Sequence, residues 1–243
     1  MSAVTVAVHW GPRPETPREQ ADRWLDLLTR LTGLSGGELG DWRWDVEGDE
    51  PGPSLPADAA ALGTALQKAN TDEDVEVIGW SAQAVGRQPG GGHARVWIQA
   101  GGSNGHSPFF AVLNLFPGTE QPFVVPLAGC LAESLVATAG AWDADTGLVY
   151  DRELFKAVKR EYGLPASRPR AGWSVFLSAE RAARVPADFP ARRLSADHGG
   201  LVLDLADAPG ELPSTEAVLA AHKALVDSGA LAPRPVPATR PKL

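Results

Sequence analysis

The serine and histidine residues of this sequence are the candidates for nucleophilic catalysis. Ser35 and Ser103 each stand in a Gly-x-Ser-x-Gly pattern, which in hydrolases places a nucleophilic serine between a strand and a helix. Ser35 follows a predicted helix and Ser103 lies between two predicted strands, so both patterns indicate turns. A hydrolase built on Ser103 and His106 is kept as the enzymatic alternative.

The histidine and cysteine residues do not have the spacing of a metal site. None of the five histidines pairs with another at the i, i+4 or x₃₋₅ separations that metal ligands favour. His93 and His106 flank one predicted strand and are interpreted as polar loop ends. Cys130 is the only cysteine, which excludes an internal disulfide and a thiolate zinc cluster. We predict no catalytic residue, no metal and no cofactor.

Acidic residues are concentrated in one part of the chain. Between Glu38 and Glu76 there are eleven acidic and two basic residues, so this segment carries nine net negative charges against −8 for the whole chain. Carboxylates are paired between residues 41 and 50, but acids in a proline-rich loop are rarely held rigidly enough for acid–base catalysis. A negative chain is also a poor ligand for nucleic acid. The segment is therefore interpreted as a surface for a partner.

Three predicted strands form the centre of the fold that must position these residues. Val75–Val85, His93–Ala100 and Phe109–Phe116 are rich in β-branched and aromatic residues, and the second alternates between apolar and polar positions. Glycine clusters between them supply the positive φ angles that tight reversals need. Links this short require antiparallel neighbours, because a parallel crossover needs roughly a dozen residues. The pattern predicts a three-stranded meander.

Helices and further strands are predicted on both sides of the meander. The sequence Thr-Pro-Arg-Glu from Thr16 is a capping box with proline at the first helical position, and Gly33 is predicted to end that helix. The other predicted helices are Ala57–Ala69, Phe123–Ala141, Asp151–Tyr162 and Ser214–Asp227. The other predicted strands are Ala3–His9 (an edge or first strand), Trp173–Leu177, Arg192–Leu194 and Leu201–Leu205.

Length and composition favour one domain. The 243 residues are 44% hydrophobic and 21% charged, as in ordinary globular proteins. We predict a single α+β domain over residues 1–229, a mostly antiparallel sheet with helices packed on it, and a proline-rich disordered tail over residues 230–243. No run approaches the roughly 18 apolar residues of a membrane helix, and the N-terminus has no secretory signal pattern. We expect a cytoplasmic protein that does not bind membranes.

Four short segments occur in order between roughly Val4 and Leu205. They are the turn Trp10-Gly-Pro-Arg-Pro-Glu15 after the first strand, Ala141-Trp-Asp-Ala-Asp-Thr-Gly-Leu-Val149, Ala171-Gly-Trp-Ser-Val-Phe-Leu-Ser178, and His198-Gly-Gly-Leu-Val-Leu203. Together they resemble the immunity protein 52 (Imm52) family of bacterial polymorphic toxin systems. Ala144 stands where the family has a proline, and the chain has long insertions rich in glycine and alanine, so it resembles a divergent member.

The resemblance implies an immunity protein that neutralises a cognate toxin by direct binding, and many partners of this family look like nucleases. A nuclease cleft must be positive to hold phosphate, and a preformed negative surface would bind and block it. We therefore predict no enzymatic activity and a toxin partner with a basic cleft, with tryptophan as aromatic anchor. The predicted partner-binding residues are Asp41, Trp42, Trp44, Asp45, Glu47, Asp49 and Glu50.

Two interpretations of the tryptophans stay open. Trp42 and Trp44 form either a short strand with one ring buried and one exposed, or an irregular loop held to the core by its indoles. Trp80, Trp97 and Trp173 are either core residues or the lining of a pocket between the meander and the helices. Such a pocket would indicate a non-catalytic regulatory domain that binds a small molecule or peptide.

Overall fold

The computed structural model describes residues 3–46, 52–89, 91–118, 125–165, 168–208 and 211–243. Its strands are β1 (Val4–Trp10), β2 (Trp42–Trp44), β3 (Trp80–Arg87), β4 (His93–Ala100), β5 (Phe109–Phe116), β6 (Thr146–Asp151), β7 (Ser174–Leu177), β8 (Arg192–Ser195) and β9 (Leu201–Asp204). Its helices are α1 (Pro17–Leu34), α2 (Ala59–Ala69), α3 (Val75–Ile78), α4 (Leu131–Ala141), α5 (Arg152–Tyr162), α6 (Ala179–Ala182) and α7 (Thr215–Asp227), with 3₁₀ turns at Ala128–Cys130 and Asp197–Gly199.

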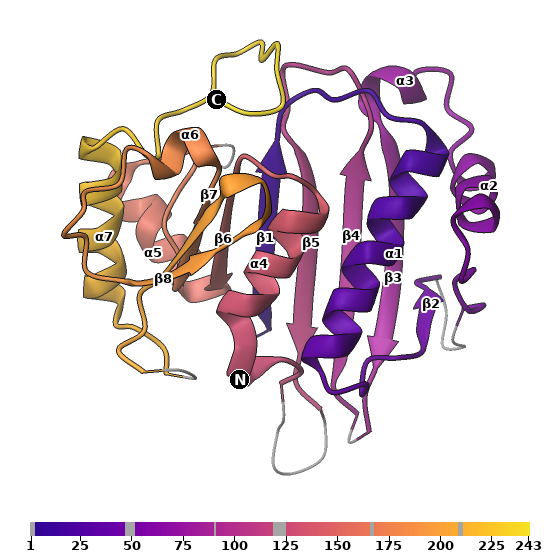
Figure 1. The fold of residues 1–243 in the computed structure, drawn as a ribbon, viewed down its shortest axis with the longest axis horizontal. Helices are drawn as coiled ribbons and strands as arrows, with labels where there is room; N and C mark the ends of the chain where they lie inside the picture. Colours follow the sequence, from indigo (N-terminus) through magenta and orange to yellow (C-terminus); the bar gives the residue numbers. More distant parts are fainter. Residues whose placement is uncertain (1–2, 47–51, 90, 119–124, 166–167, 209–210) are drawn as a thin grey trace.

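The nine strands form one antiparallel sheet in the order β2-β3-β4-β5-β1-β6-β7-β9-β8. The predicted α+β class and the meander β3-β4-β5 are confirmed. The first strand, β1, is not an edge: it lies between β5 and β6. Helices α1 and α4 lie across one face of the sheet, and α5 and α7 lie behind its β6 side (Figure 1).

Burial alternates along β4 and β5 of the meander, as expected for strands with one face on the core. On β4, Ala94, Val96 and Ile98 are buried, whereas Trp97 is 39% exposed. The prediction was wrong at the start of β3, because Val75–Ile78 forms a single helical turn. Gly79, with φ of 85°, ends that turn and allows the strand to begin at Trp80.

Most helix ends follow the predicted caps. In the capping box, Thr16 N–H donates to Glu19 Oε2 at 2.8 Å, and Glu19 N–H donates to Thr16 Oγ1 at 3.3 Å. Asp151 and Ser214 also cap their helices as predicted. The predicted stop at Gly33 was wrong: the helix continues to Leu34, and the first positive φ falls at Gly36.

The helix predicted over Phe123–Ala141 is shorter in the structure. Residues 123 and 124 lie outside the described residues, and the helix α4 begins only at Leu131. A positive φ at Leu127 and the 3₁₀ turn precede it. On α7, Leu225 is buried whereas its neighbour Val226 is 46% exposed, because adjacent helical residues point about 100° apart.

The C-terminal residues after α7 contain no helix or strand in the part of the chain that the structure describes. They lie across the end of the sheet where β1 leaves it (Figure 1). Gly11 N–H donates to the Pro241 carbonyl at 2.7 Å, and Ala238 N–H donates to the Gly105 carbonyl at 2.7 Å. Backbone hydrogen bonds therefore join this segment to two distant loops, and the disorder expected from its composition stays a prediction.

Candidate partner-binding site

The turn that follows β1 is held to the end of α4 by stacked aromatic rings. The rings of Trp10 and Trp142 lie 5.4 Å apart with an interplanar angle of 9°. The Arg13 guanidinium lies 5.3 Å from the Trp10 ring centroid and donates to the Trp142 carbonyl at 2.9 Å. Two of the segments that carry the Imm52 resemblance therefore contact each other. The contact is a structural one, made by stacked rings and a hydrogen bond.

The same turn is joined to α1 by a carboxylate with two arginine partners. Glu15 Oε1 lies 2.9 Å from Arg13 Nε and 2.8 Å from Arg23 Nε. Arg23 also donates to the Ala141 carbonyl at the end of α4, at 2.9 Å. This network fixes the entrance to α1 and so shapes one wall of a surface groove.

That groove, here called the acidic groove, is an open hollow whose lining includes Glu19, Glu76, Trp80 and Ser103. The Trp80 indole is fixed by its N–H, which donates to the Glu15 carbonyl at 3.3 Å. The Ser103 hydroxyl donates to the Glu76 carbonyl at 3.1 Å. The groove thus places an aromatic ring beside two carboxylates that are far apart in sequence.

The free charge of the groove comes from Glu19 and Glu76. The backbone N–H of Thr16, and then its hydroxyl, hold the pKa of the Glu19 carboxyl below its ordinary value, so Glu19 is anionic at neutral pH. Glu15, by contrast, is balanced by Arg13 and Arg23. The α2–α3 link beside the groove adds further exposed carboxylates without an ion pair among the described residues, namely Asp72, Glu73 and Asp74.

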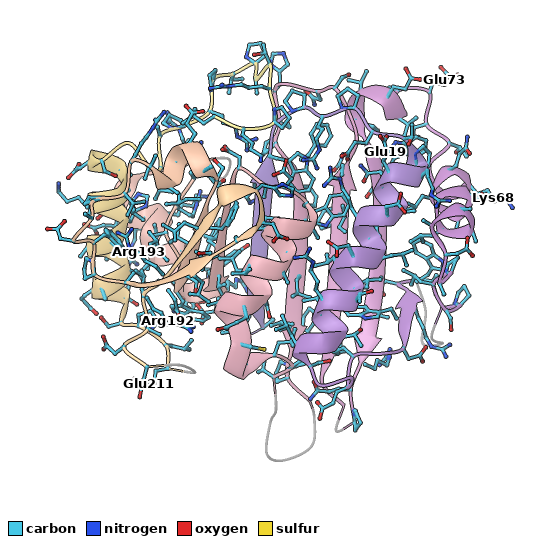
Figure 2. All side chains as sticks on the ribbon, in the orientation of Figure 1. Glu19, Lys68, Glu73, Arg192, Arg193 and Glu211 are labelled. Atoms are coloured by element: carbon cyan, nitrogen blue, oxygen red, sulfur yellow. The ribbon has the colours of Figure 1, made fainter. Side chains whose placement is uncertain are left out.

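These acidic residues lie toward one end of the molecule. Glu73 is seen there near α3, and Glu19 lies at the start of α1 (Figure 2). Arg192 and Arg193 lie toward the opposite end, on β8 (Figure 2). Lys68 lies at the same end as Glu73, and Glu211 lies at the same end as the two arginines (Figure 2). The excess of acid therefore gathers at one end of the molecule, while the opposite end carries both signs of charge.

The predicted aromatic anchors are not freely exposed. Trp42 is 7% exposed and its indole N–H donates to Thr32 Oγ1 at 3.1 Å. Trp44 is half-buried and packs against the core. The strand interpretation of this pair is confirmed, since β2 pairs with β3 at the edge of the sheet, but both indoles serve the core.

The predicted carboxylates of this region are partly paired. Asp41 lies 2.8 Å from Arg43 Nε, and Asp45 lies 2.6 Å from Arg95 Nε. Glu47, Asp49 and Glu50 lie outside the described residues. The structure therefore brings Asp41 and Asp45 to the β2 edge, and the seven-residue site stays a prediction. Sequence reasoning missed Glu19 as a site residue, although the capping box places it on the first turn of α1, and it considered Trp80 only for a different pocket.

The other predicted sites are dispersed. Trp80 lines the acidic groove, and Trp173 is 8% exposed in the core. Trp97 lies on the outer face of β4 against Phe110, with ring centroids 4.8 Å apart. These three tryptophans therefore do not form one pocket.

The residues singled out for reactive chemistry also lie apart. Ser103 lines the acidic groove and His106 a different cavity. Cys130 is half-buried, and burial raises the pKa of its thiol. Within the described ranges, no group of three or more His, Cys, Asp or Glu side chains is arranged to hold a metal ion. None of the helices described has the length and apolarity to cross a membrane.

No family model matches the chain, and no curated protein matches its sequence. Among solved structures, the chain is similar to the Pseudomonas aeruginosa T6SS protein PA0821, at 16% sequence identity and a TM-score of 0.49. The similarity covers 95% of this chain and 74% of that one. At this identity and score, the likeness assigns no function.

Proposed function

We propose that this protein is an immunity protein that binds a cognate bacterial toxin of the nuclease class and neutralises it by covering its active cleft. On this proposal the protein acts by binding and has no catalytic activity of its own. The resemblance to Imm52 supports the class of function. The observation that carries the proposal is a groove lined by Glu19, Glu76 and the indole of Trp80. Both carboxylates are exposed and have no ion pair among the described residues, and the exposed carboxylates of the α2–α3 link directly precede α3.

This arrangement suits a basic partner for two physical reasons. Carboxylates that are not already paired gain charge-assisted hydrogen bonds when an arginine or lysine approaches. An indole face beside them attracts the same cation, with a contribution of about 0.5–2 kcal/mol. A negative surface also increases the rate of association with a positive cleft, and this increase becomes smaller as the ionic strength rises.

The first experiment co-expresses this protein with each protein encoded beside its gene. Rescue from growth arrest, followed by recovery of a stable complex in a pull-down, is the expected result. If no neighbouring protein is toxic and none binds, the proposed function is wrong.

The second experiment locates the surface once a toxin is found. Glu73→Gln with Glu76→Gln removes two charges beside the groove, and Glu211→Gln with Glu216→Gln removes two exposed charges elsewhere. The first pair is expected to slow association at least several-fold and to reduce its salt dependence, while the second pair leaves both unchanged. Equal effects of the two pairs would refute this location.

The site predicted from sequence has its own test. Charge reversal of Asp41, Asp45, Asp49 and Glu50 together is expected to abolish toxin binding if the β2 edge forms the interface. Unchanged affinity and unchanged salt dependence would exclude that edge.

A further inference from the structure

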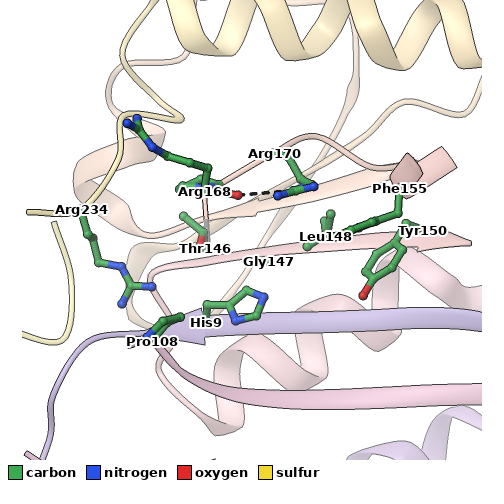
Figure 3. Close-up of a pocket in the computed structure, with 11 residues that line it drawn as sticks. His9, Pro108, Thr146, Gly147, Leu148, Tyr150, Phe155, Arg168, Arg170 and Arg234 are labelled. Atoms are coloured by element: carbon green, nitrogen blue, oxygen red, sulfur yellow. Dashed lines mark hydrogen bonds between the residues drawn. The ribbon is translucent and has the colours of Figure 1, made fainter. Parts of the chain in front are cut away.

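A small cavity lies at the end of β1 where the tail crosses the sheet (Figure 3). Its volume is about 70 Å³, and His9, Tyr150, Arg170 and Arg234 are among the residues that line it. A second cavity of about 190 Å³ shares Arg168 and Arg234 with it. The two cavities therefore adjoin, and the smaller one has an unusually basic wall for a chain of net charge −8.

The charge of Arg234 is only weakly compensated. Its Nε lies 3.5 Å from Asp145 Oδ2, but Asp145 already accepts from Arg181 Nε at 2.8 Å and from Arg181 Nη2 at 2.9 Å. Asp145 also accepts from the Ser178 hydroxyl and from the Leu243 N–H. One carboxylate thus faces two guanidinium groups, which leaves an excess of positive charge beside the cavity.

Two buried nitrogen atoms at this cavity have no hydrogen-bond partner among the described residues. They are Nη1 of Arg234 and Nδ1 of His9. The two side chains point toward the same space (Figure 3). Buried polar atoms are nearly always satisfied in native proteins, so these two mark a place where an acceptor from outside the chain would fit.

The His9 imidazole shares its cavity with the guanidinium groups of Arg170 and Arg234. Burial, followed by Arg234 and Arg170, lowers the pKa of His9 to about 4. The imidazole is therefore neutral at neutral pH, and in the tautomer protonated at Nδ1 it donates a hydrogen bond into the cavity. Burial also raises the pKa of Tyr150, so its phenol keeps its proton.

The opposite wall is rigid. Arg170 is 3% exposed, donates from Nη2 to the Pro165 carbonyl at 2.6 Å, and lies 4.2 Å from the Phe155 ring centroid. Donors that are held before a ligand arrives bind it at a lower entropic cost.

We propose that this cavity is a binding site for the oxyanion group of a small molecule, either a phosphate or a carboxylate, with Arg234 Nη1 and His9 Nδ1 as its donors. The smaller cavity takes the oxyanion, and the organic part of the ligand extends into the adjoining cavity. This site is separate from the acidic groove and does not depend on the proposed toxin partner.

The test uses the full chain with inorganic phosphate and acetate as probes, at constant ionic strength. Saturable binding is measured by calorimetry, and the side-chain resonances of His9 are followed by NMR. The expected result is saturable binding of at least one probe with a shift of the His9 signals that saturates at the same concentration. Preference for phosphate or for acetate identifies the kind of oxyanion.

Variants assign the binding to the cavity. Arg234→Gln and His9→Gln are each expected to lower the affinity for the probe about tenfold or more. Arg240→Gln, on the exposed part of the tail, is expected to leave the affinity unchanged. If Arg234→Gln does not fold, the NMR titration of the unaltered chain decides the question. Absence of saturable binding by both probes, or binding that leaves the His9 signals unmoved, overturns the proposal.

Discussion

Replacing Asp145 with asparagine should be among the most destabilising single changes in this protein. Asp145 and Arg181 are both fully buried, and they form two hydrogen bonds, at 2.8 and 2.9 Å. Asparagine keeps the size of the side chain but removes its charge, and Arg181 then remains in the interior without a carboxylate. Removing one partner of a buried ion pair costs about 3–5 kcal/mol.

The assay is urea denaturation at pH 7 followed by circular dichroism. Glu180→Gln is the matched control, because Glu180 lies next to Arg181 on α6 and pairs at 3.1 Å with Arg184, just after that helix, but both of these side chains are exposed. Exposed pairs contribute about 0–1 kcal/mol. Asp145→Asn is therefore expected to lower the free energy of unfolding several times more than Glu180→Gln.

A double-mutant cycle separates this pair from its surroundings. Arg181→Met removes the other partner, and it also removes the donor to the carbonyls of Ala230 and Ala232. If the ion pair is the cause, the double variant is less unstable than the sum of the single variants by about 1–3 kcal/mol. Additive losses, or a cost for Asp145→Asn no larger than that for Glu180→Gln, would refute the reasoning.

Three further changes test other parts of the structure. Burial lowers the folded-state pKa of His222 to about 4, so on acidification the unfolded chain takes up this proton first. The free energy of unfolding therefore falls between pH 6.5 and 4, by up to ~1.4 kcal/mol per pH unit. His222→Asn should make this fall less steep. An unchanged slope in denaturation curves would contradict this. Thr16→Ala should cost about 1 kcal/mol of unfolding free energy through loss of the cap, and no measurable loss would show that the cap is dispensable. Gly172→Ala should be clearly destabilising by thermal melting, because a Cβ there would lie 2.1 Å from the Val149 carbonyl oxygen, and a wild-type melting temperature would rule out that overlap.

Local signals in the sequence predicted the helices and the meander. Caps such as Thr16 and Asp151 act within one turn, so residue identity alone nearly determines them. The same signals failed for Val75–Ile78, where β-branched residues favour a strand. There the helical turn is formed by backbone hydrogen bonds to the Asp74 carbonyl and ended by Gly79. The average strand propensity of the segment does not take account of these interactions.

The candidate site was predictable in its charge but not in its arrangement. The excess of acid between Glu38 and Glu76 is visible in the sequence, and the structure places the described part of that segment at one end of the molecule. Which of its carboxylates form ion pairs depends on contacts that the sequence does not show. Asp45 pairs with Arg95 of β4, fifty residues away, whereas Glu76 lines the groove with Trp80 and has no ion pair with any described residue.

Net charge alone also conceals the basic cavity. The whole chain is acidic, yet Arg170 and Arg234 come together at His9 from segments that are far apart in sequence. The tail brings Arg234 there, and the composition of the tail indicates only disorder. Because the two sites differ in sign and in the residues that form them, a variant at one leaves the charge at the other in place. Slower toxin association in Glu73→Gln with Glu76→Gln, together with unchanged phosphate or acetate binding, would therefore show that the protein has two independent sites.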